Sequence, residues 1–283
     1  MAAGAPCLLS GAGSRGSDGG AMRDVVSGLI LAAALPCGAA QAAPSQERQR
    51  EVWDDVGRAA RKGPVDVALD GQAVLHLPDG EVFVPQPQAD RLLDLMGGPG
   101  GDPGLLGVIL PRDPRATWIM PVRFAASGFI KDDEAKTWAA DDLLAGVRGR
   151  TDAQNRAREK KGIAPLEIVG WALAPRYDAA RRRLAWAVSS RAVGAGAERA
   201  DVDYNACALG RDGYFSFGMT VDLSDLPKLG PIAERQLAAL EFNPGKRYED
   251  FDGKAGRVAE HGLAAVVVGG AARQAGVAAP AGA

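Results

Sequence analysis

The chain has 283 residues, of which 47% are hydrophobic and 24% are charged, the balance of a polypeptide that buries a core rather than of a disordered one. This length predicts one or two domains. The formal net charge of −2 supplies no global basic field, which excludes whole-molecule attraction to nucleic acid or to anionic lipid.

Residues 22–42 have the pattern of a signal peptide. Met22 and Arg23 give a short positive start, an apolar run covers 25–35, and Ala40-Gln41-Ala42 is an A-x-A cleavage pattern. The apolar run is about half of the roughly 20 residues that a membrane-spanning helix needs. We therefore expect residues 1–42 to be an upstream extension plus a signal peptide. The mature chain is then exported to the periplasm or to the periplasmic face of the inner membrane.

Cleavage would also decide which cysteines remain. Cys7 and Cys37 lie in the segment that would be lost, which leaves Cys207 as the one thiol of the mature chain. A single thiol forms no internal disulfide, and this suits an oxidising compartment and a reducing one equally well.

The mature chain begins with a polar lead-in over 43–62, in which a short helix can form, and continues into a predicted β-hairpin. Apolar residues alternate over 65–69 and again over 73–77, and Asp70-Gly71 lies between the two runs. An Asp-Gly loop between alternating runs is the strongest local hairpin signal, because both loop positions favour positive φ.

The following patterns predict an α+β fold. Ala89, Leu92, Leu93 and Met96 share one face of a helix. Closely spaced strands favour antiparallel pairing, so we expect an antiparallel sheet with the N-terminal hairpin, flanked by about three helices. The other expected elements are strands over 105–110, 117–124, 166–173, 183–190, 202–209 and 214–223, and helices over 141–161 and 231–240.

These patterns also set the expected boundaries. We interpret 63–258 as a single α+β domain and 259–283 as a short apolar C-terminal segment, a truncated membrane anchor. Residues 262–272 of this segment are uncharged but rich in Gly and Ala, which carry little transfer energy into lipid.

Several short motifs in this domain occur together: Gly63-Pro64-Val65, residues 128–133 (GFIKDD), Val169-Gly170-Trp171, Tyr177-Asp178, Asp203-Tyr204-Asn205 and residues 244–251 (PGKRYEDF). Their combination resembles a bacterial family of uncharacterised membrane-anchored proteins, the domain of unknown function 2167 family, from about Gly63 to Gly270. The resemblance implies an envelope protein with a signal peptide and a hydrophobic C-terminal anchor, and it implies no reaction. This sequence departs from the family at its end, where similar proteins continue into a longer apolar helix.

Two patterns match ligand-binding motifs without their structural context. Residues 11–16 spell the dinucleotide fingerprint, but no strand precedes them and no helix follows. Asp201, Asp203 and Asn205 open like a calcium loop, but Ala206 occupies the position that needs Gly. We interpret these three as the polar side of a strand, and we expect no cofactor and no metal.

The reactive side chains also have plainer interpretations. Cys207 with His76 or His261 can be imagined as a nucleophile and base, but a lone Cys in an apolar strand is usually buried packing. We expect residues 132–134 (DDE) to complement a helix N-terminus and residues 181–183 (RRR) to form a solvated turn. We therefore assign no catalytic residue.

A candidate docking loop follows the last expected helix. Its flexible glycine, cations, aromatic pair and acid can serve an anionic ligand or a partner protein. The simpler interpretation is a turn whose Tyr248 and Phe251 pack on the sheet while Lys246 and Arg247 face water. The loop consists of Gly245, Lys246, Arg247, Tyr248, Asp250 and Phe251.

Export and the missing catalytic set favour a non-catalytic periplasmic or envelope domain that binds a partner or an envelope component. The partner is an unidentified envelope protein or small ligand, with no role for nucleic acid and with membrane contact through the C-terminus. The alternative is a periplasmic enzyme that uses carboxylates such as Asp132, Asp133 and Asp250.

Overall fold

A computed structural model describes residues 45–98, 101–160, 162–196, 199–254 and 256–274. Its centre is an eight-stranded sheet in which every pair of neighbours is antiparallel, so the expected antiparallel α+β fold is confirmed. The strand order is β1 (Arg61–Lys62), β4 (Glu81–Pro85), β5 (Leu105–Pro111), β6 (Met120–Ala125), β10 (Tyr214–Asp222), β9 (Asp201–Leu209), β8 (Arg183–Ala192) and β7 (Leu166–Asp178).

The N-terminal hairpin belongs to a second, three-stranded sheet. β2 (Val65–Leu69) pairs with β3 (Ala73–Leu77), and β3 pairs with β11 (Leu240–Phe242) from the far end of the chain. Asp70 and Gly71 have φ values of 48° and 63°, as the Asp-Gly signal requires. Leu69 pairs with Ala73, so the loop has three residues rather than the two expected.

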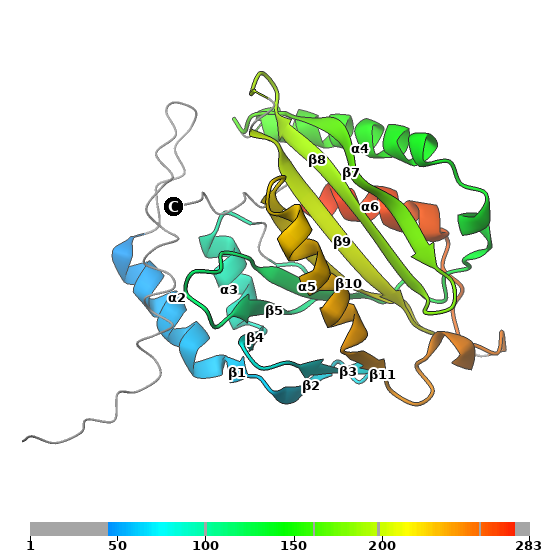
Figure 1. Ribbon diagram of the computed structural model, residues 1–283, viewed down its shortest axis with the longest axis horizontal. Coiled ribbons are helices and arrows are strands. Elements are labelled where there is room, and N and C mark those ends of the chain that lie inside the picture. The colour runs from blue at the N-terminus through cyan, green and yellow to red at the C-terminus, as the bar shows by residue number, and fades with distance from the viewer. Residues whose placement is uncertain (1–44, 99–100, 161, 197–198, 255, 275–283) are drawn as a thin grey trace, which may run out of the picture.

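Five helices of the described residues cover the sheets in three places. α5 (Leu226–Ala238) lies on one face of the large sheet, over β9 and β10, while α4 (Ala140–Lys160) and α6 (Leu263–Gln274) lie on the other (Figure 1). α2 (Gln46–Ala59) and α3 (Gln88–Leu95) pack against each other beside β4 and β5. The sequence predicted about three helices, because the lead-in and the apolar C-terminal segment were not counted among them.

The side-chain alternation of β9 explains why both faces of the large sheet are covered. Val202 and Tyr204 point into the core beneath α5 and the small sheet, whereas Cys207 and Leu209 point into the core beneath α4 and α6. Because successive strand residues face opposite sides, a strand that is apolar on both faces needs a layer on each.

Several elements differ from the sequence expectation, and three of them show why. β4 was missed because its first four residues are all buried, which removes the alternation that marks a half-exposed strand. β7 runs on to Asp178 through three register shifts, and such bulges interrupt the period of two. α5 begins at Leu226 and contains Pro231, where the sequence predicted a start at Pro231.

The C-terminal segment is built into the domain as far as it is described. Leu263, Val266 and Val267 of α6 are buried against the large sheet, and the Glu134 carboxylate accepts a 2.7 Å hydrogen bond from the Ala264 amide at the start of the helix. None of the described helices is both long and apolar enough to cross a bilayer. The expected signal peptide lies outside the described residues.

Candidate functional site

The docking loop is tied to the turn between β9 and β10. The Lys246 ammonium lies 2.7 Å from the Asp212 carboxylate, and the Arg211 amide donates a 3.0 Å hydrogen bond to the Lys246 carbonyl. Asp250 accepts a 2.9 Å hydrogen bond from the Arg247 amide, which closes the short helix η3 (Tyr248–Asp250). Of the two expected solvent-facing cations, Arg247 is exposed, whereas Lys246 is partly buried in its ion pair.

The aromatic residues of the loop pack inward, as the simpler interpretation expected. Tyr248 is buried, and its hydroxyl lies 2.9 Å from the Ile130 carbonyl. Phe129 stacks on Phe251 with ring centroids 4.0 Å apart, and its centroid is 4.5 Å from that of Tyr248. The loop is therefore a packed part of the domain.

Asp132 collects three donors from distant parts of the chain. It accepts hydrogen bonds from the Tyr177 hydroxyl at 2.7 Å, the Tyr248 hydroxyl at 3.1 Å and the Arg182 guanidinium at 2.5 Å. Arg182 also lies over the Tyr248 ring, 4.5 Å from its centroid. We call these four residues, Asp132, Tyr177, Arg182 and Tyr248, the Asp132 cluster.

The cluster holds its carboxyl group ionised. Burial alone would raise the pKa of Asp132, but the hydrogen bonds from Tyr177 and Tyr248 and the charge of Arg182 outweigh it, so the pKa is lowered. Burial and the Asp132 charge together raise the pKa of both tyrosines. An ionised acid that is bonded to its own neighbours acts as a structural anchor.

The three carboxylates of the enzyme alternative have separate environments. Asp132 belongs to its cluster, Asp250 caps η3, and Asp133 is exposed at the start of the short helix η1 (Asp133–Lys136). Glu134 fulfils the expected capping role, but for α6 rather than for the helix that follows it.

The arginine turn corrects another expectation. Arg182 was expected to be solvated, but at φ 53° its side chain turns back onto Tyr248 and Asp132. Arg181 pairs with Asp178 at 2.8 Å.

Cys207 is buried, whereas both histidines are exposed. Cys207 is buried beneath α6, and burial raises the pKa of its thiol, which disfavours the nucleophilic thiolate. His76 is exposed on the small sheet, where hydrogen bonds to Asp66 and Glu241 raise its pKa. His261 is exposed just before α6.

The polar residues of β9 share one face, as expected, but Asp203 and Asn205 of that face are buried rather than solvated. Asp203 accepts a 2.8 Å hydrogen bond from the Thr220 hydroxyl, and burial raises its pKa to about 7. Among the described residues, no group of three or more His, Cys, Asp and Glu side chains is placed to hold a metal ion.

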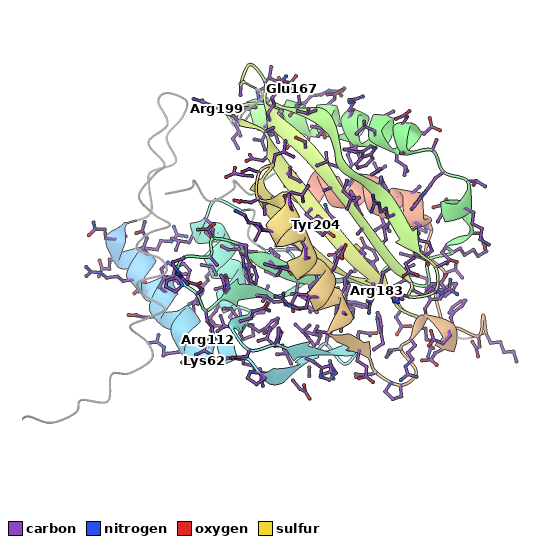
Figure 2. The ribbon with its side chains drawn as sticks, in the orientation of Figure 1. Lys62, Arg112, Glu167, Arg183, Arg199 and Tyr204 are labelled. Carbon is purple, nitrogen blue, oxygen red and sulfur yellow. The ribbon has the colours of Figure 1, made fainter. Side chains whose placement is uncertain are left out.

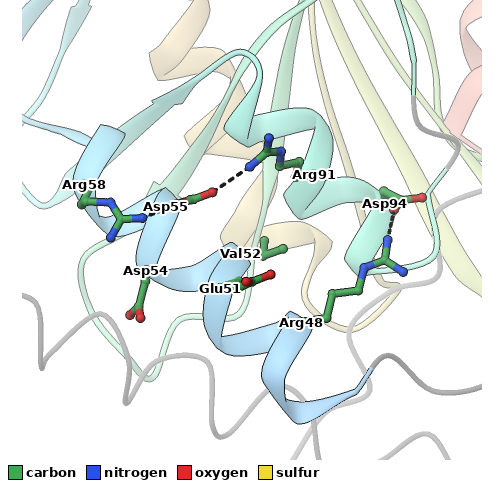
Figure 3. A pocket seen from close by; sticks show the side chains of 8 residues that line it. All are labelled: Arg48, Glu51, Val52, Asp54, Asp55, Arg58, Arg91 and Asp94. Carbon is green, nitrogen blue, oxygen red and sulfur yellow. Dashed lines mark hydrogen bonds and ion pairs between the residues drawn. The ribbon is translucent and has the colours of Figure 1, made fainter.

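A surface hollow of about 640 Å³ lies between α2 and α3 (Figure 3). Arg48 pairs with Asp94 and Arg91 pairs with Asp55, each at 2.7 Å, so these charges are matched across the two helices. Sequence reasoning missed this hollow because its walls come from segments that are far apart in the chain.

Sequence reasoning also missed an exposed apolar group at the opposite end of the β7–β8 pair from the Asp132 cluster. Ile163, Val169 and Val193 are exposed by 39%, 49% and 56%. The Val193 amide donates a 2.9 Å hydrogen bond to the Pro165 carbonyl, which holds the segments before β7 and after β8 together. Isolated apolar residues in sequence gave no signal for this grouping.

Comparison with known proteins identifies a family. Residues 60–283 match the family model described as "Protein of unknown function (DUF2167)". No curated protein matches the chain. Among solved structures, the chain is similar to the solution structure of cyanobacterial PsbP from Synechocystis sp. PCC 6803, with 13% identity and a TM-score of 0.38 over 75% of this chain and 100% of that one.

Proposed function

Since the chain belongs to the DUF2167 family, which is described as of unknown function, we propose that it is a non-catalytic domain of the cell envelope that binds a partner or an envelope component. Its place is the periplasm or the periplasmic face of the inner membrane. The signal-peptide pattern of residues 22–42 supports this location.

One observation carries the proposal. Two of the groups best suited to chemistry are engaged inside the domain, because Asp132 serves two tyrosines and an arginine while Cys207 lies in the core. By contrast, exposed aliphatic and cationic side chains gather where α4 ends. A domain that bonds its reactive groups internally and exposes such a surface is suited to binding.

The carboxylate-dependent enzyme has less support. General acid–base catalysis by a carboxyl pair needs both groups within reach of one substrate. Here Asp132 and Asp250 each serve an internal structural contact, and Asp203, whose pKa of about 7 suits proton transfer, is buried within the domain. Docking through Lys246 and Arg247 remains a prediction, with exposed Arg247 as its most accessible group.

Complementation of a deletion strain under envelope stress tests the proposal. Variants of the reactive groups should restore growth in detergent as the unaltered chain does. Variants of the exposed aliphatic and cationic side chains where α4 ends should not. Full loss of rescue by a folded reactive-group variant would contradict the proposal, with circular dichroism and export checked for each protein. The reactive-group variants are Cys207→Ala, His76→Ala, His261→Ala, Asp133→Asn and Asp250→Asn.

A further inference from the structure

The end of the domain beside the C-terminus of α4 combines exposed aliphatic residues with cations that form no ion pair with another described residue. We call this the end surface, formed by Ile163, Val169 and Val193 with Arg156, Lys160 and Arg199. Figure 2 shows Arg199 beside Glu167 at this end, far from Lys62 and Arg112. From these residues we propose that the end surface binds the head groups of an anionic phospholipid bilayer. This inference rests on the proposed function, because a lipid surface is one kind of envelope component.

Hydrogen bonds place the segments of the end surface side by side. The Ile163 amide donates a 2.9 Å hydrogen bond to the Arg158 carbonyl. The Arg158 guanidinium in turn donates a 2.9 Å hydrogen bond to the Ala164 carbonyl. Arg148 of α4 donates to the Val169 carbonyl at 3.3 Å. Ile163 and Val193 therefore project from loops that are fixed to the end of α4 and to each other.

The local charge departs from the slightly negative charge of the whole chain. Five basic and two acidic residues lie between Arg148 and Lys160. Cations in the last turn, such as Lys160, also complement the helix dipole, but Arg156 lies before that turn. Arg156, Lys160 and Arg199 are exposed and form no ion pair with other described residues. Glu167, the acid that Figure 2 shows beside Arg199, is paired with Arg191.

This combination fits a lipid surface better than a second copy of the chain. Copies facing each other through the end surface would bring like charges together, which is destabilising. Aliphatic side chains that project from loops and are flanked by Arg and Lys can enter the head-group region while the cations meet phosphate.

The direction of α6 agrees with an arrangement in which the end surface faces the bilayer. α6 starts beside η1, where the Ala264 amide meets Glu134, and its Val268 lies next to Gly146 of α4. α4 and α6 therefore run in the same direction, and Figure 1 shows both helices behind the sheet. α6 therefore points toward the end of the molecule that carries the end surface.

Co-sedimentation of the full chain with vesicles tests the inference. One set of vesicles contains phosphatidylcholine with a third of phosphatidylglycerol, and the other contains phosphatidylcholine alone. The end-surface variant is Arg156→Gln/Lys160→Gln/Arg199→Gln. Its matched control, Arg61→Gln/Lys62→Gln/Arg112→Gln, removes the same charge at the other end of the domain and keeps both chain termini unchanged.

We expect binding to the anionic vesicles only. The end-surface variant should bind roughly a hundredfold more weakly, because each Lys or Arg near an anionic surface is worth about a factor of five. The control variant should lose little by comparison. Ile163→Ser/Val193→Ser should weaken binding by about tenfold at both low and high salt.

Three results would overturn the lipid assignment. One is absence of binding to anionic vesicles, and another is equal loss in the end-surface and control variants. In the third, the chain binds poly-glutamate but not vesicles, and the end-surface variant loses this binding. That result would indicate an acidic protein partner. If vesicle binding fails while the end-surface variant still fails to complement the deletion strain, the lipid assignment is wrong and the proposed binding function stands.

Discussion

The two ends of the β7–β8 pair use arginine in opposite ways. At the turn between the strands, Arg182 is folded over Tyr248 and bonded to Asp132, so its charge is neutralised within the domain. At the other end, Arg156 and Arg199 are exposed beside Ile163 and Val193. Residues 128–133, Tyr177-Asp178 and residues 244–251 are conspicuous motifs that mark the first end. The second end, which includes Val169 of a shorter motif, carries the exposed surface. A residue pattern therefore shows where polar groups are dense, and only the fold shows whether they are already satisfied.

The largest expected effect on stability concerns Asp203, the buried acid of β9. Asp203 accepts one side-chain hydrogen bond, from Thr220, whereas Asp132 accepts three. Its pKa is raised to about 7, so the folded state holds a proton that the unfolded state releases near pH 4. Stability should therefore fall as the pH rises from about 4 to about 7 and then level off.

Replacement by the uncharged amide should remove this loss. Asp203→Asn should be nearly neutral at pH 4 and more stable than the unaltered chain by up to about 4 kcal/mol at pH 9. Urea unfolding across this pH range measures the difference, with the exposed Asp152→Asn as control. A constant difference at every pH would show that Asp203 is not a buried, protonated acid.

The second effect tests the Asp132 cluster. Asp132→Ala leaves the Arg182 guanidinium and two tyrosine hydroxyls without their shared acceptor, which should lower the free energy of unfolding by about 2–3 kcal/mol. The neighbouring Asp133→Ala removes the same group from an exposed position and should change it by less than about 0.5 kcal/mol. Equal losses for the two variants in denaturant unfolding would show that Asp132 stabilises the fold no more than an exposed carboxylate does.

The same pair of variants also has a pH signature. The folded pKa of Asp132 lies below its usual value, so its stabilisation is present above the unfolded pKa and is lost as the pH falls through the folded pKa. The deficit of Asp132→Ala should therefore shrink in acid, whereas that of Asp133→Ala should not.

A smaller effect isolates one hydrogen bond of the cluster. Tyr177→Phe removes a donor to Asp132 and keeps the ring, so it should cost about 1 kcal/mol. In the Asp132→Ala background the same substitution should cost little, because the acceptor is gone. Additive costs in this double-mutant cycle would mean that the tyrosine stabilises the fold by packing alone.

The smallest effect belongs to the end surface. Ile163→Ser and Val193→Ser replace exposed side chains, so each should change the free energy of unfolding by no more than about 0.5 kcal/mol. A loss above 1 kcal/mol in thermal or urea unfolding would show that these residues stabilise the fold.

Local periodicity predicted much of the fold. The alternation of 65–77 gave the hairpin, and the spacing of Ala89 to Met96 gave α3. It could not predict β4, whose two buried faces leave no alternation, or the pairing of β3 with β11 across more than 160 residues.

The candidate site was less accessible to sequence reasoning. The inward packing of Tyr248 and Phe251 was expected, but Asp132 gathers its donors from β7, the following turn and η3, and a sequence pattern does not reveal such distant contacts. The end surface was missed because its residues are scattered along the chain until folding brings 156–169 beside Val193, and the motif that contains Val169 gave no sign of this grouping.

Hydrogen exchange of the full chain with and without vesicles containing a third of phosphatidylglycerol compares both ends in one experiment. We expect slower amide exchange in 158–169 and 191–196 on vesicle binding, and no change in 245–251. Protection confined to 245–251, or none anywhere in the described domain, would contradict the assignment of the binding surface to the end of α4.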